Sequence, residues 1–169
     1  INKTGEYIAN LLGCESALIV SSASAGIAQS VGAMIAKDDM SLVYNVNNPK
    51  KQVKREIIIP KGHNVDYGVP VEEMIRLGGG EVVEAGYANM CNKEHIIREI
   101  NENTAAIMYI KSHHCVQKSM LSVLDAVQVA KEYNLPLIVD AAAEEDLNVY
   151  YELGADLVIY SGAKADRKS

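Results

Sequence analysis

The most informative residue for chemistry is a lysine near the end of the sequence. Lys164 stands in Ser161-Gly162-Ala163-Lys164, directly after the apolar run Leu157 to Tyr160. A lysine on a turn of small residues at the carboxyl end of a strand can approach a bound aldehyde closely. Partial loss of water lowers the pKa of its amine and makes it nucleophilic. The alternative reading is a surface lysine in a frayed terminus.

A second chemical signal is an aspartate that ends a very apolar stretch. The segment Leu137-Ile138-Val139-Asp140-Ala141-Ala142 places the Asp140 carboxylate where burial is costly without a cationic or hydrogen-bonding partner. A protonated pyridine nitrogen is such a partner, and the ion pair keeps the pyridine ring effective as an electron sink. The structural alternative is a cap, because Asp is a preferred N-cap of a following helix.

A third signal is a run of small residues and hydroxyls before a helical pattern. The segment Ser21-Ser22-Ala23-Ser24-Ala25-Gly26 precedes the pattern Ile27 to Ile35. Free backbone N–H groups at a helix start bind phosphate, so this segment is a candidate phosphate cradle. Ordinary N-capping is the alternative explanation.

Histidines follow two of the apolar runs. His63 comes after the run Ile57 to Ile59, where an imidazole could stack on a flat cofactor ring or donate to a substrate. His113 comes after the run Ala105 to Ile110. A loop position without a role is the alternative for each. We expect no metal site, because Cys115 is the only obvious further ligand nearby.

The elements that carry these residues alternate along the chain. Apolar runs predict strands, and periodic spacing predicts the helices between them. The predicted strands are Ile57–Ile59, Glu81–Glu84, Ala105–Ile110, Leu135–Asp140 and Leu157–Tyr160, and the predicted helices are Thr4–Leu12, Ile27–Ile35, Val71–Leu77, Lys93–Asn101 and Val123–Tyr133. Because the strands are apolar on both faces, the pattern predicts an α/β fold with a mainly parallel sheet and helices on both faces. Ligands of such sheets bind at the carboxyl ends of the strands.

Composition sets the broad class. The chain has 169 residues, of which 49% are hydrophobic, so one domain with one core is expected. A formal charge of −6 gives no generic attraction to nucleic acid or anionic lipid. Three widely spaced cysteines without a CxxC pattern favour a reducing cytoplasm. No apolar run approaches the roughly 20 residues that a membrane span needs.

The order of these elements resembles that of fold type I enzymes dependent on pyridoxal 5′-phosphate (PLP), which have the aspartate aminotransferase-like large domain. Within them the chain is similar to the selenocysteine synthase (L-seryl-tRNA(Sec) selenium transferase) superfamily, and most to its D-glucosaminate-6-phosphate ammonia-lyase branch. The matching stretches cover nearly the whole chain and are Leu12–Val20 with the serine turn, Gly80–Gly86, Thr104–His113, Val139-Asp140 and Ser161–Lys164.

The resemblance implies roles for the matching residues. It implies that Lys164 forms the Schiff base with PLP and shuttles a proton, and that Asp140 faces the pyridine nitrogen. His63 is implied near the ring face, and His113 near the ring oxygen of the cofactor or the substrate. The complete set of implied cofactor-binding residues is Ser22, Ala23, Ser24, His63, Asp140, Ser161 and Lys164.

The resemblance also implies a function. It implies a cytoplasmic PLP-dependent lyase that deaminates a phosphorylated amino sugar acid by α,β-elimination and forms a homodimer or higher homo-oligomer. Residues 1–169 are then expected to be the PLP-binding large domain, a fragment without the N-terminal segment and the small C-terminal domain. Selenium transfer to seryl-tRNA is an alternative, which would make tRNA a partner, and a non-catalytic scaffold is another. Ser21-Ser22, His114-Cys115-Val116 and Ala163 depart from the synthase pattern and favour the ammonia-lyase branch.

Overall fold

Five short strands form one parallel sheet in the computed structural model, which describes residues 2–48 and 50–162. The strand order across the sheet is β2-β1-β3-β4-β5, and all four pairings are parallel. The strands are β1 (Glu56–Pro60), β2 (Glu81–Ala85), β3 (Thr104–Ile110), β4 (Leu137–Asp140) and β5 (Leu157–Ile159). The predicted α/β class with a parallel sheet is confirmed.

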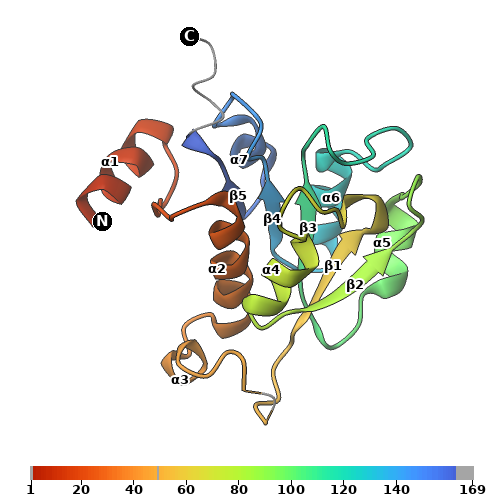
Figure 1. The fold of residues 1–169 in the computed structure, drawn as a ribbon, viewed down its shortest axis with the longest axis horizontal. Helices are drawn as coiled ribbons and strands as arrows, with labels where there is room; N and C mark the ends of the chain where they lie inside the picture. The colour runs from red at the N-terminus through yellow and green to blue at the C-terminus, as the bar shows by residue number, and fades with distance from the viewer. Residues whose placement is uncertain (1, 49, 163–169) are drawn as a thin grey trace.

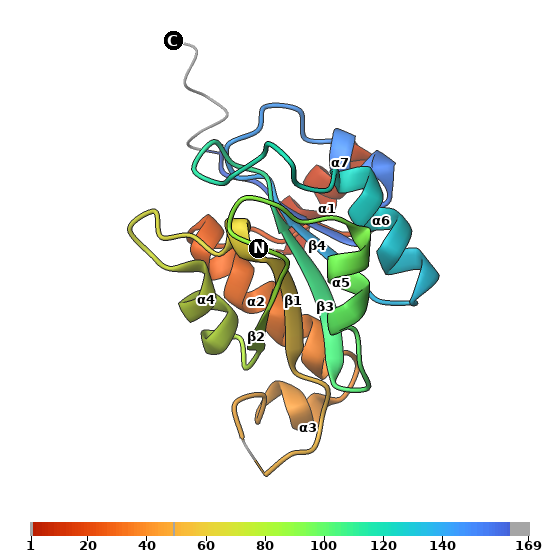
Figure 2. The same cartoon turned by 90° about the vertical axis from the view of Figure 1, so that its right-hand side faces the viewer.

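Helices cover both faces of this sheet (Figures 1 and 2). On one face lie α2 (Ala23–Ala36) and α4 (Val71–Leu77), which belong to one apolar cluster. On the other face lie α5 (Lys93–Glu99), α6 (Val123–Glu132) and α7 (Val149–Leu153), which belong to a second cluster. The strands supply both clusters, since Ile58 points into the second one while Ile57 and Ile59 point into the first. Alternate residues of a strand face opposite ways, which is why these strands are apolar throughout.

Two predicted boundaries move for local reasons. Helix α2 begins at Ala23 rather than Ile27, because the Ser22 hydroxyl accepts a hydrogen bond from the Ala25 N–H at 3.1 Å and caps the helix. Strand β4 begins at Leu137 rather than Leu135, because Pro136 has no N–H to give to the ladder.

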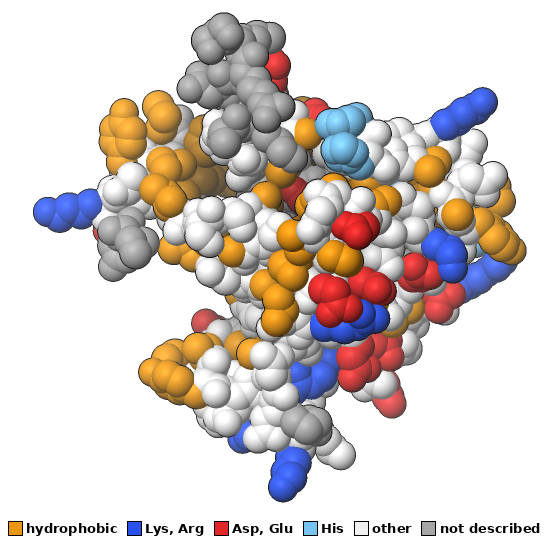
Figure 3. All heavy atoms as spheres, viewed as in Figure 1, with side chains coloured by type: hydrophobic (Ala, Val, Ile, Leu, Met, Phe, Trp, Pro, Cys, Tyr) orange, Lys and Arg blue, Asp and Glu red, His pale blue; other side chains and the backbone are white. Residues whose placement is uncertain are grey.

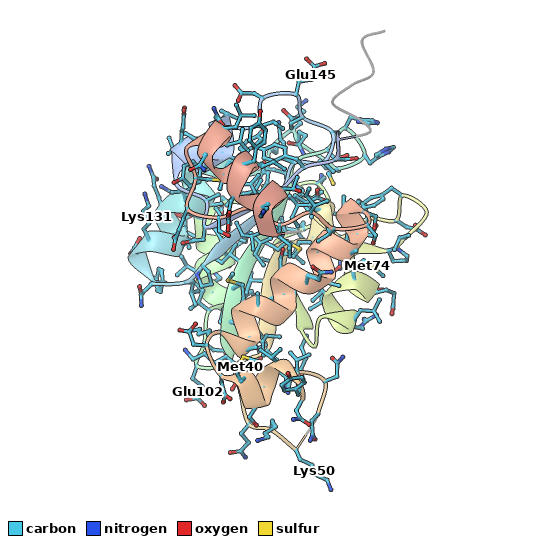
Figure 4. The ribbon with its side chains drawn as sticks, turned by 90° about the vertical axis from the view of Figure 1, so that its left-hand side faces the viewer. Met40, Lys50, Met74, Glu102, Lys131 and Glu145 are labelled. Carbon is cyan, nitrogen blue, oxygen red and sulfur yellow. The ribbon has the colours of Figure 1, made fainter. Side chains whose placement is uncertain are left out.

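The remaining elements lie at the periphery. Helix α1 (Asn2–Leu12) and the short α3 (Met40–Val43) expose apolar side chains that gather over these helices in Figure 3. Met40 and Lys50 lie at the opposite end of the molecule from Glu145, which follows β4 (Figure 4). The α3 segment is therefore remote from the carboxyl ends of the strands. None of the helices in the described ranges is long and apolar enough to cross a membrane.

The close approach of α2 to the end of α4 gives a prediction for stability. A Cβ at Gly78 would lie 2.4 Å from the Ala28 carbonyl oxygen and 2.8 Å from the Val31 Cβ. We expect Gly78→Ala to lower the free energy of unfolding by about 2 kcal/mol, because backbone must move to relieve the overlap. Urea denaturation measures this change.

The matched control is Gly32→Ala, where a Cβ meets only the Gly78 carbonyl oxygen at 3.5 Å. This change lies inside α2 and is expected to keep or raise stability, since alanine is the better helix former. Equal destabilisation by both substitutions would contradict the packing argument.

Candidate active site

The strand order contains a switch point between β1 and β3. The chain runs from β1 outward to β2 and then returns past β1 to β3, so the direction of winding changes between β1 and β3. Open parallel sheets bind ligands outside the carboxyl ends of strands near such a switch point. A small hollow lies at this edge, lined by Ala23, Tyr67, Lys111, Ser112, His114, Asp140, Ala142 and Ala143.

Asp140 lies at the wall of this hollow. It ends β4, is only 3% exposed, and accepts a hydrogen bond from the Ala142 N–H at 3.0 Å through Oδ1. No α-helix follows before α7, which begins at Val149, so Asp140 does not cap an α-helix. The Asp140 carboxyl group instead closes a turn after β4 and forms part of the wall of the hollow.

The first turn of α2 reaches the same hollow. Ala23 lines it, and Ser22 and Ser24 flank Ala23 in the sequence. A Cβ at Gly26 would lie 3.0 Å from the Cγ2 of Ile159, so the helix passes very close to the end of β5. A helix N-terminus carries N–H groups without helical partners and the positive end of the dipole, which suits a phosphate.

Tyr67 is a site residue that sequence reasoning missed. It stands on a turn in which the Asp66 carboxylate accepts from the Gly68 N–H at 2.8 Å, and Gly68 adopts a φ of 100°. The Tyr67 hydroxyl is buried beside the Asp140 carboxylate, without a hydrogen bond of ordinary geometry to the described part of the chain. Burial, and then the charge of Asp140, raise the Tyr67 pKa, so the phenol is neutral. No periodicity or motif marks a tyrosine in such a loop.

The loop after β3 contributes a cation. Lys111 and Ser112 line the hollow, and the Lys111 Nζ donates to the Gln117 Oε1 at 3.3 Å. Of the two adjacent histidines, His114 lines the hollow and His113 does not. Both are exposed, their rings lie 4.0 Å apart, and histidine side chains are visible on the surface in Figure 3. The predicted role of His113 stays a prediction, and His114 is the one that the fold places at the hollow.

His63 is a buried residue next to the end of β3. Its side chain is 0% exposed, and its Nδ1 accepts from the Ile110 N–H at 3.4 Å. Its ring packs edge-on against Tyr109 with centroids 4.5 Å apart. His63 thus joins the loop after β1 to the end of β3 and is not among the residues that line the hollow. Its predicted place at a cofactor ring face stays a prediction.

Burial gives His63 a measurable effect on stability. Desolvation lowers the His63 pKa from 6.5 to about 4; the nearby charge of Lys111 adds to this, and the Val116 backbone opposes it. The unfolded chain therefore binds a proton between pH 6.5 and 4 that the folded chain does not. We expect the free energy of unfolding to fall by about 3 kcal/mol as the pH is lowered through this window.

The contribution of His63 is isolated by comparison with His63→Gln. Urea denaturation from pH 7 to pH 4 is expected to give a shallower loss of stability in this variant. His113→Gln, at an exposed histidine, should keep the wild-type pH profile. If His63→Gln also keeps that profile, the histidine is not buried in its neutral form.

Comparison with known proteins gives clear relatives. The chain is 52% identical over 165 residues to the D-glucosaminate-6-phosphate ammonia lyase of Salmonella typhimurium, covering 98% of this chain and 44% of the relative. A solved structure of D-glucosaminate-6-phosphate ammonia-lyase matches with a TM-score of 0.91 at 51% identity, over 98% of this chain and 44% of that one. An L-seryl-tRNA(Sec) selenium transferase of Mannheimia succiniciproducens is 30% identical over 65% of this chain and 28% of the relative.

The chain belongs to the selenocysteine synthase superfamily of fold type I PLP enzymes. Another relative in the comparison is a 5′-C-glycyluridine monooxygenase-decarboxylase of Streptomyces sp, 39% identical over 95% of this chain and 40% of the relative. Aspartate aminotransferase from Thermus thermophilus shares the fold, with a TM-score of 0.56 at 16% identity over 85% of this chain and 35% of that one. No protein-family model matches.

This superfamily member spans less than half the length of the first two curated relatives, 44% and 40%.

The predicted Schiff-base residue, Lys164, lies outside the described residues. Ser161 is described and half-buried, just after β5, whose Ile159 pairs with Asp140 in the sheet. The chain therefore enters its Ser-x-x-Lys segment at the same edge of the sheet as the hollow.

Proposed function

We propose that the protein containing this chain is a PLP-dependent lyase that removes ammonia from a phosphorylated amino sugar acid such as D-glucosaminate 6-phosphate. The observation that carries the proposal is the 52% identity to an ammonia lyase over 98% of this chain. The 39% and 30% identities to the monooxygenase-decarboxylase and the selenium transferase are weaker support for those two reactions.

The residues of the hollow fit PLP. The Asp140 carboxylate is buried at the carboxyl end of β4, where it suits a cationic pyridine nitrogen. The first turn of α2, with Ser22, Ala23 and Ser24, suits the phosphate, and Ser161 follows β5 at the same edge. PLP, when bound, withdraws electrons from the substrate carbon next to the amine.

The chain's own residues supply the remaining chemistry. With PLP bound, the Asp140 carboxylate would keep a proton on the pyridine nitrogen, because a buried carboxylate favours the cationic form of a group beside it. The Lys164 amine is proposed to hold the cofactor aldehyde covalently and then to accept the proton from the substrate α-carbon. The β-hydroxyl leaves from the neighbouring carbon, and hydrolysis of the enamine product yields a 2-keto acid and ammonia.

A coupled assay tests this proposal. The complete protein is incubated with PLP and D-glucosaminate 6-phosphate, and ammonia and 2-keto acid are measured together. Equal release of both products is expected. A protein that binds PLP but releases neither product would refute the lyase, and selenium transfer to seryl-tRNA would be assayed next. A protein that binds no PLP would favour the scaffold alternative.

We also propose a homo-oligomer in the cytoplasm. Tyr7, Leu11, Leu18 and Ile19 are apolar side chains that are at least half exposed on and after α1, which suits contact with a second copy. The three cysteines are all free, as in a reducing compartment. Light scattering of the purified protein measures its mass, and a monomer at micromolar concentration would contradict the oligomer.

A further inference from the structure

Two side chains that can donate hydrogen bonds, Tyr67 and Lys111, line the hollow beside Asp140. The Tyr67 hydroxyl is buried beside the Asp140 carboxylate, and no hydrogen bond of ordinary geometry fixes it within the described part of the chain. The Lys111 ammonium is half-buried, and its acceptor among residues 2–48 and 50–162 is the neutral amide oxygen of Gln117, at 3.3 Å. Both side chains line the same hollow. Because neither donor is fully paired in ordinary geometry, a ligand that supplies acceptor oxygens is favoured here.

Several cations in the described part of the chain are paired with carboxylates, but Lys111 is not. Lys61 pairs with Glu84 at 2.8 Å, Lys93 lies 3.7 Å from Asp125, and Arg76 pairs with two glutamates. Among residues 2–48 and 50–162, no carboxylate lies within 4.0 Å of the Lys111 Nζ. Its charge is therefore not neutralised by an ion pair there.

Gln117 holds Lys111 in place without cancelling its charge. The Gln117 Nε2 donates to the Ser112 carbonyl at 3.4 Å, which turns the amide oxygen toward the ammonium. The arrangement positions a cation in a hollow of a chain whose formal charge is −6. A fixed cation in a concave, partly desolvated place attracts anions selectively.

Under the proposed function, each charged group of the hollow can be paired with a charged group of the cofactor or the substrate. The Asp140 carboxylate is matched by the pyridine nitrogen, and the cofactor phosphate by the first turn of α2. The charge of Lys111 is then left for the substrate. The raised pKa of Tyr67 keeps its hydroxyl protonated, so it is a donor to any oxygen placed beside it.

We propose that Lys111 and Tyr67 together bind an anionic oxygen of the substrate, Lys111 supplying the charge and Tyr67 a neutral O–H donor. This inference rests on the proposed function. It makes both residues determinants of specificity for a substrate that carries a carboxylate or a phosphate ester, two groups with the same anionic oxygen chemistry.

Kinetics of the complete enzyme with D-glucosaminate 6-phosphate test the proposal. Lys111→Met is expected to raise KM by about 30-fold and to change kcat by less than about threefold, because a charge-assisted hydrogen bond in a desolvated site is lost. Lys111→Arg should recover part of the affinity. Tyr67→Phe should raise KM by about fivefold. Lys118→Met, at an exposed lysine of the same loop, is the matched control and should behave as wild type.

Two inhibitors identify the anionic group. D-Glucosaminate lacks the phosphate, and D-glucosamine 6-phosphate lacks the carboxylate. The loss of affinity caused by Lys111→Met should disappear for the inhibitor that lacks the group bound by Lys111. The loss of affinity should persist for the inhibitor that keeps the group bound by Lys111.

The PLP dissociation constant, measured by titration of the apoprotein, gives a readout independent of turnover. It should change by less than about twofold in Lys111→Met, whereas a loss of PLP affinity would show that Lys111 serves the cofactor and would overturn the proposal. An unchanged KM would overturn it as well. An inactive wild-type enzyme refutes the proposed function and this inference with it, while an active wild type with an unaffected Lys111→Met variant refutes the inference alone.

Discussion

Lys164→Ala is expected to abolish covalent retention of PLP and to lower turnover by more than about 1000-fold. The reason is that no other amine in Ser161-Gly162-Ala163-Lys164 can bind the cofactor aldehyde and serve as the base at the substrate α-carbon. The measurement is borohydride reduction of the PLP-loaded protein, followed by mass spectrometry of its peptides. In the wild type, the reduced cofactor should be found on Lys164.

The matched control for this experiment is Lys168→Ala, which removes another lysine of the same terminal segment. This variant should retain PLP after reduction and keep its turnover. Labelling of a lysine other than Lys164 in the wild type would show that the Ser-x-x-Lys interpretation is wrong. Normal turnover of the Lys164→Ala variant would also show that this interpretation is wrong, independently of the borohydride experiment.

Asp140→Asn is expected to lower turnover by about 1000-fold while the protein remains folded. The amide keeps the size of the side chain and an oxygen that can accept from the Ala142 N–H, but it removes the negative charge. Without that charge the pyridine nitrogen is no longer kept protonated, and the ring loses power as an electron sink. Steady-state kinetics measure the loss, and circular dichroism checks the fold.

Chemical rescue separates this electrostatic role from a structural one. A PLP analogue methylated at the pyridine nitrogen carries a permanent positive charge and needs no carboxylate to maintain it. It should restore part of the activity of Asp140→Asn. A variant that the analogue does not rescue, with an altered circular dichroism spectrum, would indicate that Asp140 mainly supports the fold.

Hydrophobic pattern alone was enough to predict the fold class. The strands Ile57–Ile59 and Ala105–Ile110 are apolar at every position because helices cover both faces of the sheet. Strands that are apolar on both faces throughout a sheet are typical of parallel sheets between two layers of helices. The position of Asp140 at the end of a strand could also be predicted from the residues next to it in the sequence. Since all strands run parallel, the residue that ends each strand must lie at one edge of the sheet.

The details of the hollow depended on contacts between residues far apart in sequence. The Ile110 N–H and the Tyr109 ring contact His63 and help to bury it, while its place at a ligand stays a prediction. No pattern around His63 contains that information, because the partners come from another strand. Burial of this kind is decided by packing between elements.

The amino-acid sequence by itself thus determined which strand ends carry chemistry, because apolar runs, small-residue turns and the polar residues that end them are local. Tertiary structure alone decided which loop side chains meet in the hollow. It placed His114 at the wall of the hollow, brought Tyr67 beside Asp140, and left Lys111 without a carboxylate within 4.0 Å in the described part of the chain. The physical reason is that a loop side chain takes its direction from turns and from neighbours distant in sequence, and no periodicity encodes either.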